Sequence, residues 1–224
     1  MNYTVASLMS EIRVALDQNM TSDQLISSSD IDTLSLEEII ESKIPDAARM
    51  VEIEAPHHLL DGGKTFGTSI TWYDGEGSGS GSGSGSGYGS GKTKLPDDFL
   101  RLMSFQMSDW SYPCTNAITD QDPLYAAQFS RFPGIKGNPQ KPVVAISVQP
   151  SGTYLEFFSC TQGSGVSVKR AHYIPIPTIS DGNIDICPKL SRAIVYRAAH
   201  LVAAEIGDAN AAAALLQASN NLMV

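Results

Sequence analysis

Apolar residues recur along the chain at two different periods, and the changes of period divide it into three regions. In the first region the spacing is helical, so one side of the segment is apolar and the other polar. The residues on this stripe are Val5, Leu8, Met9, Ile12 and Leu16. A polar, Ser/Asp-rich stretch over 21–32 follows, and we expect it to be a loop.

A second helix is expected immediately after this stretch. Ser35 and Glu38 have the spacing of a capping box, in which a serine side chain and a glutamate three residues later satisfy free N–H groups. Apolar positions continue at helical spacing up to Val51. Pro45 lacks an N–H and its ring crowds the preceding turn, so we expect it to kink or split this helix.

From residue 64 the period changes to two, which is typical of strands with one buried face. The alternation is visible in "TFGTSITWY", "LMSFQMSDW" and "VSVKRAHYIPI". The stretch "PVVAISVQPSGTYLEFFSC" predicts a hairpin, with Pro150 and Gly152 in its turn. We expect an antiparallel meander between about residues 64 and 180.

The last region returns to the helical period in "PKLSRAIVYRAAHLVAAEI". Gly207 suits the left-handed position that ends a helix, and Asp208 suits the cap of the next one, over about 209–221. The predicted fold class is therefore α+β. N- and C-terminal helices form a small bundle, and an inserted antiparallel β-meander carries a long Gly-Ser hairpin loop. The predicted parts are 1–62 (helical and acidic), 63–182 (the β-domain, with a Gly-Ser arm over 74–94) and 183–224 (helical, packing with 1–62).

The Gly-Ser run "GSGSGSGSGSGYGSG" occupies residues 77–91, inside a predicted hairpin. A linker between domains would not stand there, because neither half of a hairpin is a plausible domain. We expect a natural loop extension or a replaced loop tip. Fifteen residues of free coil span roughly 20 Å. The run is predicted to be an arm that becomes ordered by backbone pairing on assembly, with Tyr88 as its anchor.

Charge is concentrated at the N-terminal end of the chain. Residues 1–62 carry 12 acidic and 3 basic side chains, which accounts for the whole net charge of −9. This distribution argues against a nucleic-acid-binding domain, which would carry a basic stripe. It suits either a solvated helix face or a basic partner. No apolar run approaches the ~20 residues of a membrane helix, and the N-terminus does not have the pattern of a secretory signal.

Residues with reactive side chains are few and scattered. Cys114, Cys160 and Cys187 are widely spaced and odd in number, so we expect buried free thiols rather than disulfides or a zinc site. His57 and His58 are adjacent, and no third ligand lies near them in sequence. The sequence therefore predicts no enzymatic activity, no metal and no cofactor.

Two groups of residues are candidates for contact with other proteins. The first lies in and beside the Gly-Ser run and comprises Trp72, Tyr73, Tyr88, Lys92 and Lys94. The second is the apolar chain end, with Leu215, Leu216, Leu222 and Met223. A chain end this apolar either packs on its own domain or docks into another subunit.

Two segments, "KLPDDFLRLMSFQMSDW" and "SRFPGIKGNPQKPVVAI", resemble the head–tail adaptor proteins of short-tailed phages. The likeness is narrower to the neck ring proteins of crAss-like phages, although the long Gly-Ser run departs from that pattern. The resemblance implies a structural virion protein without catalytic residues. It implies a ring, typically dodecameric, that joins the portal protein to the next tail protein and surrounds a DNA channel without binding DNA specifically.

The resemblance also implies where the protein acts and how its chain end is used. The expected location is the virion neck or tail, after assembly in the host cytoplasm and without contact with a membrane. Docking of the C-terminal residues into the portal or a neighbour becomes the favoured alternative. A different class of protein, a β-rich tail or surface module for binding or adhesion, remains the competing hypothesis.

Overall fold

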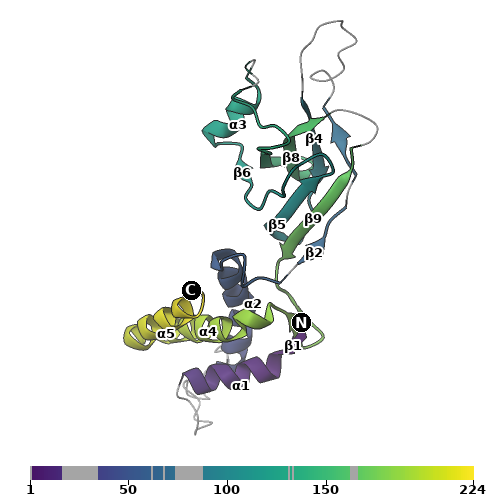
Figure 1. Ribbon diagram of the computed structural model, residues 1–224. Coiled ribbons are helices and arrows are strands. Elements are labelled where there is room, and N and C mark those ends of the chain that lie inside the picture. The colour runs from purple at the N-terminus through teal and green to yellow at the C-terminus, as the bar shows by residue number, and fades with distance from the viewer. Residues whose placement is uncertain are drawn as a thin grey trace, which may run out of the picture. The chain divides into compact units, whose positions relative to one another are not determined.

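In the computed structural model, the chain is described over residues 2–16, 35–61, 63–67, 69–73, 88–130, 132, 134–161 and 166–224. It divides into two compact units (Figure 1). The helical unit comprises Met1–Asp61 together with Ile176–Val224, and the β unit comprises Gly62–Pro175.

The helical unit is built around α4 (Ser191–Ile206), which packs against three other helices. These are α1 (Val5–Ala15), α2 (Leu36–Glu54) and α5 (Ala209–Asn221). A short 3-10 turn, Pro188–Leu190, leads into α4. The unit also holds a small antiparallel sheet, in which β11 (Asn183–Asp185) lies between β1 (Asn2–Thr4) and β10 (Ile179–Ser180).

Local signals in the sequence set several helix ends. The capping box at Ser35 and Glu38 is confirmed, with both reciprocal hydrogen bonds formed. Gly207 ends α4 in the left-handed conformation, with φ of 90°, and Asp208 caps α5, so both predictions are confirmed. Pro45 does not split the helix, since α2 continues through it. Ile44 and Ala47 are buried on either side of the proline, and this packing outweighs the lost hydrogen bond.

The described residues of the β unit form two sheets and one short helix. In the three-stranded sheet, β9 (Val168–Pro175) lies between β2 (Lys64–Thr65) and β5 (Phe99–Met107). The order in the five-stranded sheet is β3 (Thr71–Trp72), β4 (Tyr88–Lys94), β8 (Gly152–Thr161), β7 (Val144–Gln149) and β6 (Ile118–Thr119). The helix α3 (Pro123–Gln128) stands between β6 and β7 in the chain.

An aromatic core joins the two sheets of the β unit. The Phe105 ring on β5 stacks against the Phe157 ring on β8, with centroids 5.9 Å apart. Phe66 and Trp110 contact Phe105, and the Trp110 indole N–H donates to the Ser159 carbonyl oxygen at 3.1 Å. The predicted hairpin of β7 and β8 is confirmed, with Val144 opposite Phe157.

The predicted fold class was wrong. The helices do not flank a single inserted meander: α3 lies among the strands of the β unit, and the strands form three separate sheets. One of these sheets lies in the helical unit, and the pairing of β6 with β7 is parallel. The strands that overturn the prediction have two or three residues each, which is too short for a periodic pattern.

The Gly-Ser run lies between paired strands, as expected, because β3 and β4 are antiparallel with Trp72 opposite Gly91. Its last residues are not a loop: β4 begins at Tyr88 and pairs with β8, so the predicted arm extends too far. Residues 74–87, and the predicted ordering of the arm on a partner, lie outside the described residues.

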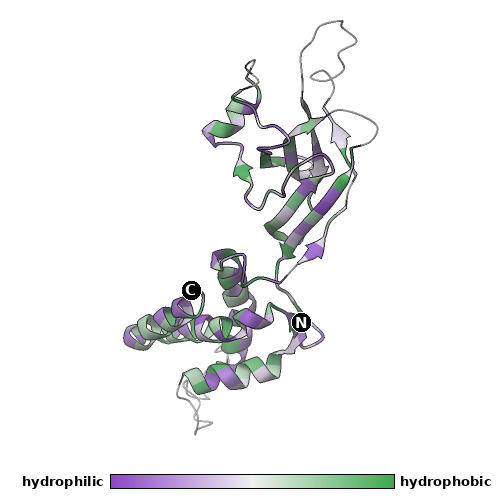
Figure 2. Ribbon diagram, viewed as in Figure 1, coloured by the Kyte–Doolittle hydropathy of each residue, from purple (hydrophilic) through white to green (hydrophobic). Residues whose placement is uncertain are grey.

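The helices of the described residues carry both hydrophobic and hydrophilic residues (Figure 2). Among the described residues, no helix combines the length and the hydrophobicity needed to cross a bilayer.

Candidate protein interface

The face of the five-stranded sheet that points away from the aromatic core carries two lysines and two tyrosines. In β4, Lys92 lies opposite Glu156 and Lys94 lies opposite Tyr154, so these side chains share one side of the sheet. Tyr73 follows β3 directly and donates its backbone N–H to the Ser90 carbonyl oxygen at 3.1 Å. We call Tyr73, Lys92, Lys94 and Tyr154 the tyrosine–lysine face.

Lys92 is the centre of this face. Its Nζ lies 4.6 Å from the centroid of the Tyr154 ring and 6.0 Å from that of Tyr73. It also donates to Gln149 Oε1 at 2.7 Å. Contacts of an ammonium group with aromatic rings contribute about 0.5–2 kcal/mol each. The lysine is therefore held in one position, whereas Lys94 is exposed to solvent.

The buried carboxylate of Glu156 lies on the same side of the sheet as the tyrosine–lysine face and is hydrogen-bonded to its surroundings. Glu156 is 3% exposed and accepts from Ser147 Oγ at 2.6 Å, from Gln149 Nε2 at 3.3 Å and from Tyr125 OH at 2.9 Å. Burial, and then Glu156, raise the pKa of Tyr125 to about 12. The same two causes raise the pKa of Tyr73, whose hydroxyl also bonds Glu156. Both phenols therefore remain neutral hydrogen-bond donors near neutral pH.

A second surface of the β unit is apolar. Around α3, the large side chains with the greatest exposure are Leu124 (54%), Phe129 (49%), Phe132 (69%) and Ile135 (55%). We call these four residues the α3 patch. Tyr125 and Phe129 pack edge-on against each other and against Phe158, which fixes α3 on the sheet. Large apolar side chains that are exposed within a short stretch of chain are a candidate interaction site in soluble proteins.

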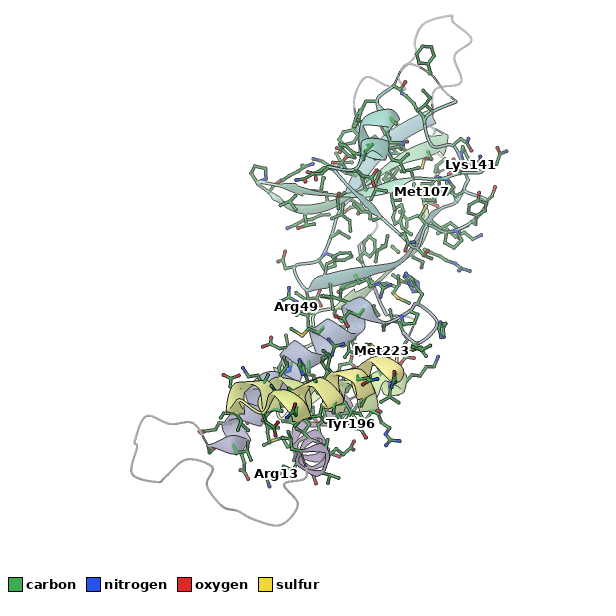
Figure 3. All side chains as sticks on the ribbon, turned by 90° about the vertical axis from the view of Figure 1, so that its left-hand side faces the viewer. Arg13, Arg49, Met107, Lys141, Tyr196 and Met223 are labelled. Carbon is green, nitrogen blue, oxygen red and sulfur yellow. The ribbon has the colours of Figure 1, made fainter. Side chains whose placement is uncertain are left out.

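The C-terminal residues lie mainly on their own unit. Leu215 and Met223 are buried, Leu216 is half-buried, and Leu222 is 39% exposed. Met223 lies at the end of α5 (Figure 3). Leu215 and Met223 are thus buried by packing within the helical unit, whereas the Leu222 side chain is accessible to a partner.

Arg197, in the first half of α4, joins the last turns of α2 and α5. From α4, its guanidinium donates to Glu54 Oε2 at 2.7 Å and to Asn220 Oδ1 at 2.8 Å. Ser219 beside it donates to the Ala193 carbonyl oxygen at 2.9 Å. The end of α2 therefore lies near the end of α5. Each of these helix ends has an exposed apolar side chain, Ile53 (48%) in α2 and Leu222 (39%) after α5.

The predicted interface residues have different positions in the structure. Tyr73, Lys92 and Lys94 come together on one face, whereas Trp72 packs against the Phe157 ring, with centroids 5.5 Å apart, on the core side. The backbone of Tyr88 pairs with Thr161 in β8.

Sequence reasoning missed Tyr154 and the α3 patch. The alternation of Tyr154 and Glu156 with Leu155 and Phe157 is a detectable signal for the face. This alternation does not show which residues of β4 lie opposite Tyr154 and Glu156 in the sheet. No periodic pattern marks the α3 patch, because α3 has only six residues.

The thiols of the chain are poorly placed to act as nucleophiles. Cys160 and Cys187 are buried, and Cys114 is partly buried. Burial raises the pKa of the Cys114 thiol to about 11, and it also raises the pKa of the other two thiols. The reactive thiolate is therefore scarce at neutral pH. Within the described ranges, no three His, Cys, Asp or Glu side chains are grouped to hold a metal ion.

No family model matches the chain, and no curated protein matches it significantly.

Proposed function

We propose that the chain is a non-enzymatic structural protein of a phage virion, a head–tail connector of the neck. It joins the portal protein to the next tail protein, as a ring of identical copies around a DNA channel. The resemblance of residues 94–110 and 130–146 to head–tail adaptors supports the family.

One structural observation carries the adaptor role. The chain has two compact units, and each exposes large apolar side chains. In the β unit these are the residues of the α3 patch, and in the helical unit they include Met50, Ile53 and Leu222. A protein that joins two partners needs two such surfaces, because one exposed patch serves one contact.

The distribution of charge between the units supports passage of DNA without binding. In the helical unit 16 carboxylates stand against 6 basic residues, a net charge of −10. In the β unit 8 carboxylates stand against 9 basic residues, a net charge of +1. An acidic surface repels phosphates, so a channel wall built from the helical unit lets DNA slide past.

Light scattering after size exclusion tests this proposal, with the chain alone and with the portal protein of the same phage. The expected result is a large oligomer of the chain, or a stable complex with the portal. A chain that stays monomeric and does not bind the portal protein would contradict the proposal. That result would favour the alternative, a β-rich tail or surface binding module, for which the tyrosine–lysine face is a suitable contact surface.

A further inference from the structure

We propose that Lys92 and Gln149 react with each other to form an isopeptide bond, an amide between their two side chains, with Glu156 as the acid–base group. Lys92 Nζ displaces the amide nitrogen of Gln149, which leaves as ammonium. The bond joins β4 to β7 across the strand between them, β8. The exchange of one amide for another needs no oxidant or reductant. The inference is independent of the proposed function, because the reaction takes place within one chain.

The three groups are in contact with one another in the order that the reaction needs. Lys92 Nζ lies 2.7 Å from Gln149 Oε1, and Gln149 Nε2 lies 3.3 Å from Glu156 Oε1. A lysine ammonium only donates hydrogen bonds and a carboxylate only accepts them, so these contacts fix which end of the amide faces each group. The carbonyl therefore faces the attacking amine, and the nitrogen that leaves faces the carboxylate.

The amine is also close to the atom that it attacks. A C=O bond is about 1.2 Å long, so Lys92 Nζ is within about 4 Å of Gln149 Cδ. Geometries poised for attack place the reacting atoms about 3–3.5 Å apart, which a small rotation of the Lys92 side chain reaches. Groups held in this way react as if at an effective concentration of about 10⁵–10⁸ M. The contact therefore favours an exchange that is very slow between free molecules.

Glu156 accounts for the protons that the reaction moves. It is directly opposite Lys92 in the pairing of β4 with β8, and both side chains are on the same side of the sheet. Its carboxylate takes one proton from the Lys92 ammonium and gives it to the Gln149 nitrogen as the C–N bond breaks. A second proton follows the same route when the attacking nitrogen becomes an amide. The products are the new amide and ammonium, and Glu156 returns to its ionised form.

The surroundings hold these groups in place and limit competition from water. Glu156 is 3% exposed, and Lys92 and Gln149 are half-buried. Ser147 Oγ donates to Glu156 Oε1 at 2.6 Å, and the Tyr73 hydroxyl is hydrogen-bonded to both Glu156 and Gln149. The amine is also fixed by the Tyr154 ring, whose centroid lies 4.6 Å from Nζ. The side chains are therefore ordered before the reaction begins.

Mass spectrometry of the intact, purified chain tests the inference. The expected mass is lower than that of the sequence by the mass of one ammonia. A tryptic digest is expected to contain the peptide of Gln149 linked through Lys92 to the peptide of β4. Incubation at mildly alkaline pH completes the reaction, because only an unprotonated amine attacks. A chain that keeps its full mass after this incubation would overturn the inference.

Three variants assign the roles of the residues. Lys92→Arg keeps the positive charge but removes the amine, so it is expected to keep its full mass. Glu156→Gln is expected to slow the loss of ammonia by about 10²–10⁴-fold, because it removes the acid–base group. Lys94→Arg is the matched control and is expected to lose ammonia as the unchanged chain does, since Lys94 is exposed and lies opposite Tyr154. Circular dichroism of each variant confirms folding.

The remaining outcomes also decide the question. If Lys92→Arg loses ammonia as the unchanged chain does, the loss comes from another site and the inference is wrong. An unchanged rate in a folded Glu156→Gln would remove Glu156 from the reaction and overturn its assigned role. If that variant does not fold, the masses of Lys92→Arg and of the unchanged chain still test the bond. None of these results bears on the adaptor function, which assembly and portal binding test separately.

Discussion

Gly91 shows that the Gly-Ser run is part of the fold at its C-terminal end. A Cβ at this position would lie 2.7 Å from Phe157 Cζ and 2.9 Å from the Thr71 carbonyl oxygen. Both neighbours are constrained, since Phe157 is in the aromatic core and Thr71 is opposite Lys92 in β3. Glycine is required here by the close approach of two strands and a ring.

We predict that Gly91→Ala destabilises the β unit by about 1–3 kcal/mol, because the added methyl group overpacks the core. Urea denaturation followed by tryptophan fluorescence measures the loss. Gly67→Ala is the control, since a Cβ at Gly67 meets nothing within 4 Å. Equal stability of the two variants would show that Phe157 and β3 move aside freely.

Glu52 is a buried carboxyl in the helical unit, 4% exposed, and it accepts the Cys187 backbone N–H at 3.3 Å. Desolvation raises its pKa from 4.5 to about 7, and nearby Asp185 adds to the shift. Between these two pH values, the Glu52 carboxyl keeps its proton in the folded state and has lost it in the unfolded state. The contribution of this proton to the free energy of unfolding is complete below pH 4.5 and is lost as the pH rises through about 7.

We predict that Glu52→Gln removes much of this pH dependence. In the unchanged chain, the free energy of unfolding is expected to fall by on the order of 3 kcal/mol between pH 4.5 and pH 8 because of Glu52. Unfolding free energies of both proteins across this range test the prediction, with the exposed Glu41→Gln as control. A stability profile of Glu52→Gln that parallels the unchanged chain would contradict it.

At the scale of elements, helix caps were predicted from the sequence, whereas strand pairings between distant segments were not. The capping box at Ser35 and the cap at Asp208 depend on a few adjacent residues, so the sequence is sufficient. The sheet that joins β1 to β11 depends on residues such as Tyr3 and Ile184, far apart in the chain. The candidate face was found only in part for the same reason, since Tyr154 reaches Lys94 through the pairing of β4 with β8.

One charged side chain links α5 to α2. Arg197 is 6% exposed and contacts both Glu54 and Asn220. We predict that Arg197→Ala speeds amide hydrogen exchange throughout α5 by about tenfold or more, since it removes these hydrogen bonds and leaves a cavity where the buried side chain packed. Arg192→Ala is the control, because Arg192 is exposed on the same helix. Unchanged exchange in α5 would show that apolar packing alone holds it.

At the scale of the whole molecule, the two units differ in both chemistry and charge. The helical unit is acidic, and the β unit combines an apolar patch with a basic, aromatic face. Opposite charges on different units of one chain favour contacts between copies, head to tail. Self-association is therefore expected to weaken as salt rises from about 0.1 M to 0.5 M, because screening acts over about 10 Å or less. Association that is unaffected by salt would contradict a charged interface.

The central claim is that identical copies form a ring that docks on the portal. Electron cryo-microscopy of the purified chain mixed with the portal protein tests it most directly. The expected result is a closed ring of copies that surrounds an open channel and is bound to the portal. Portal particles without added density, beside monomers of the chain, would contradict it.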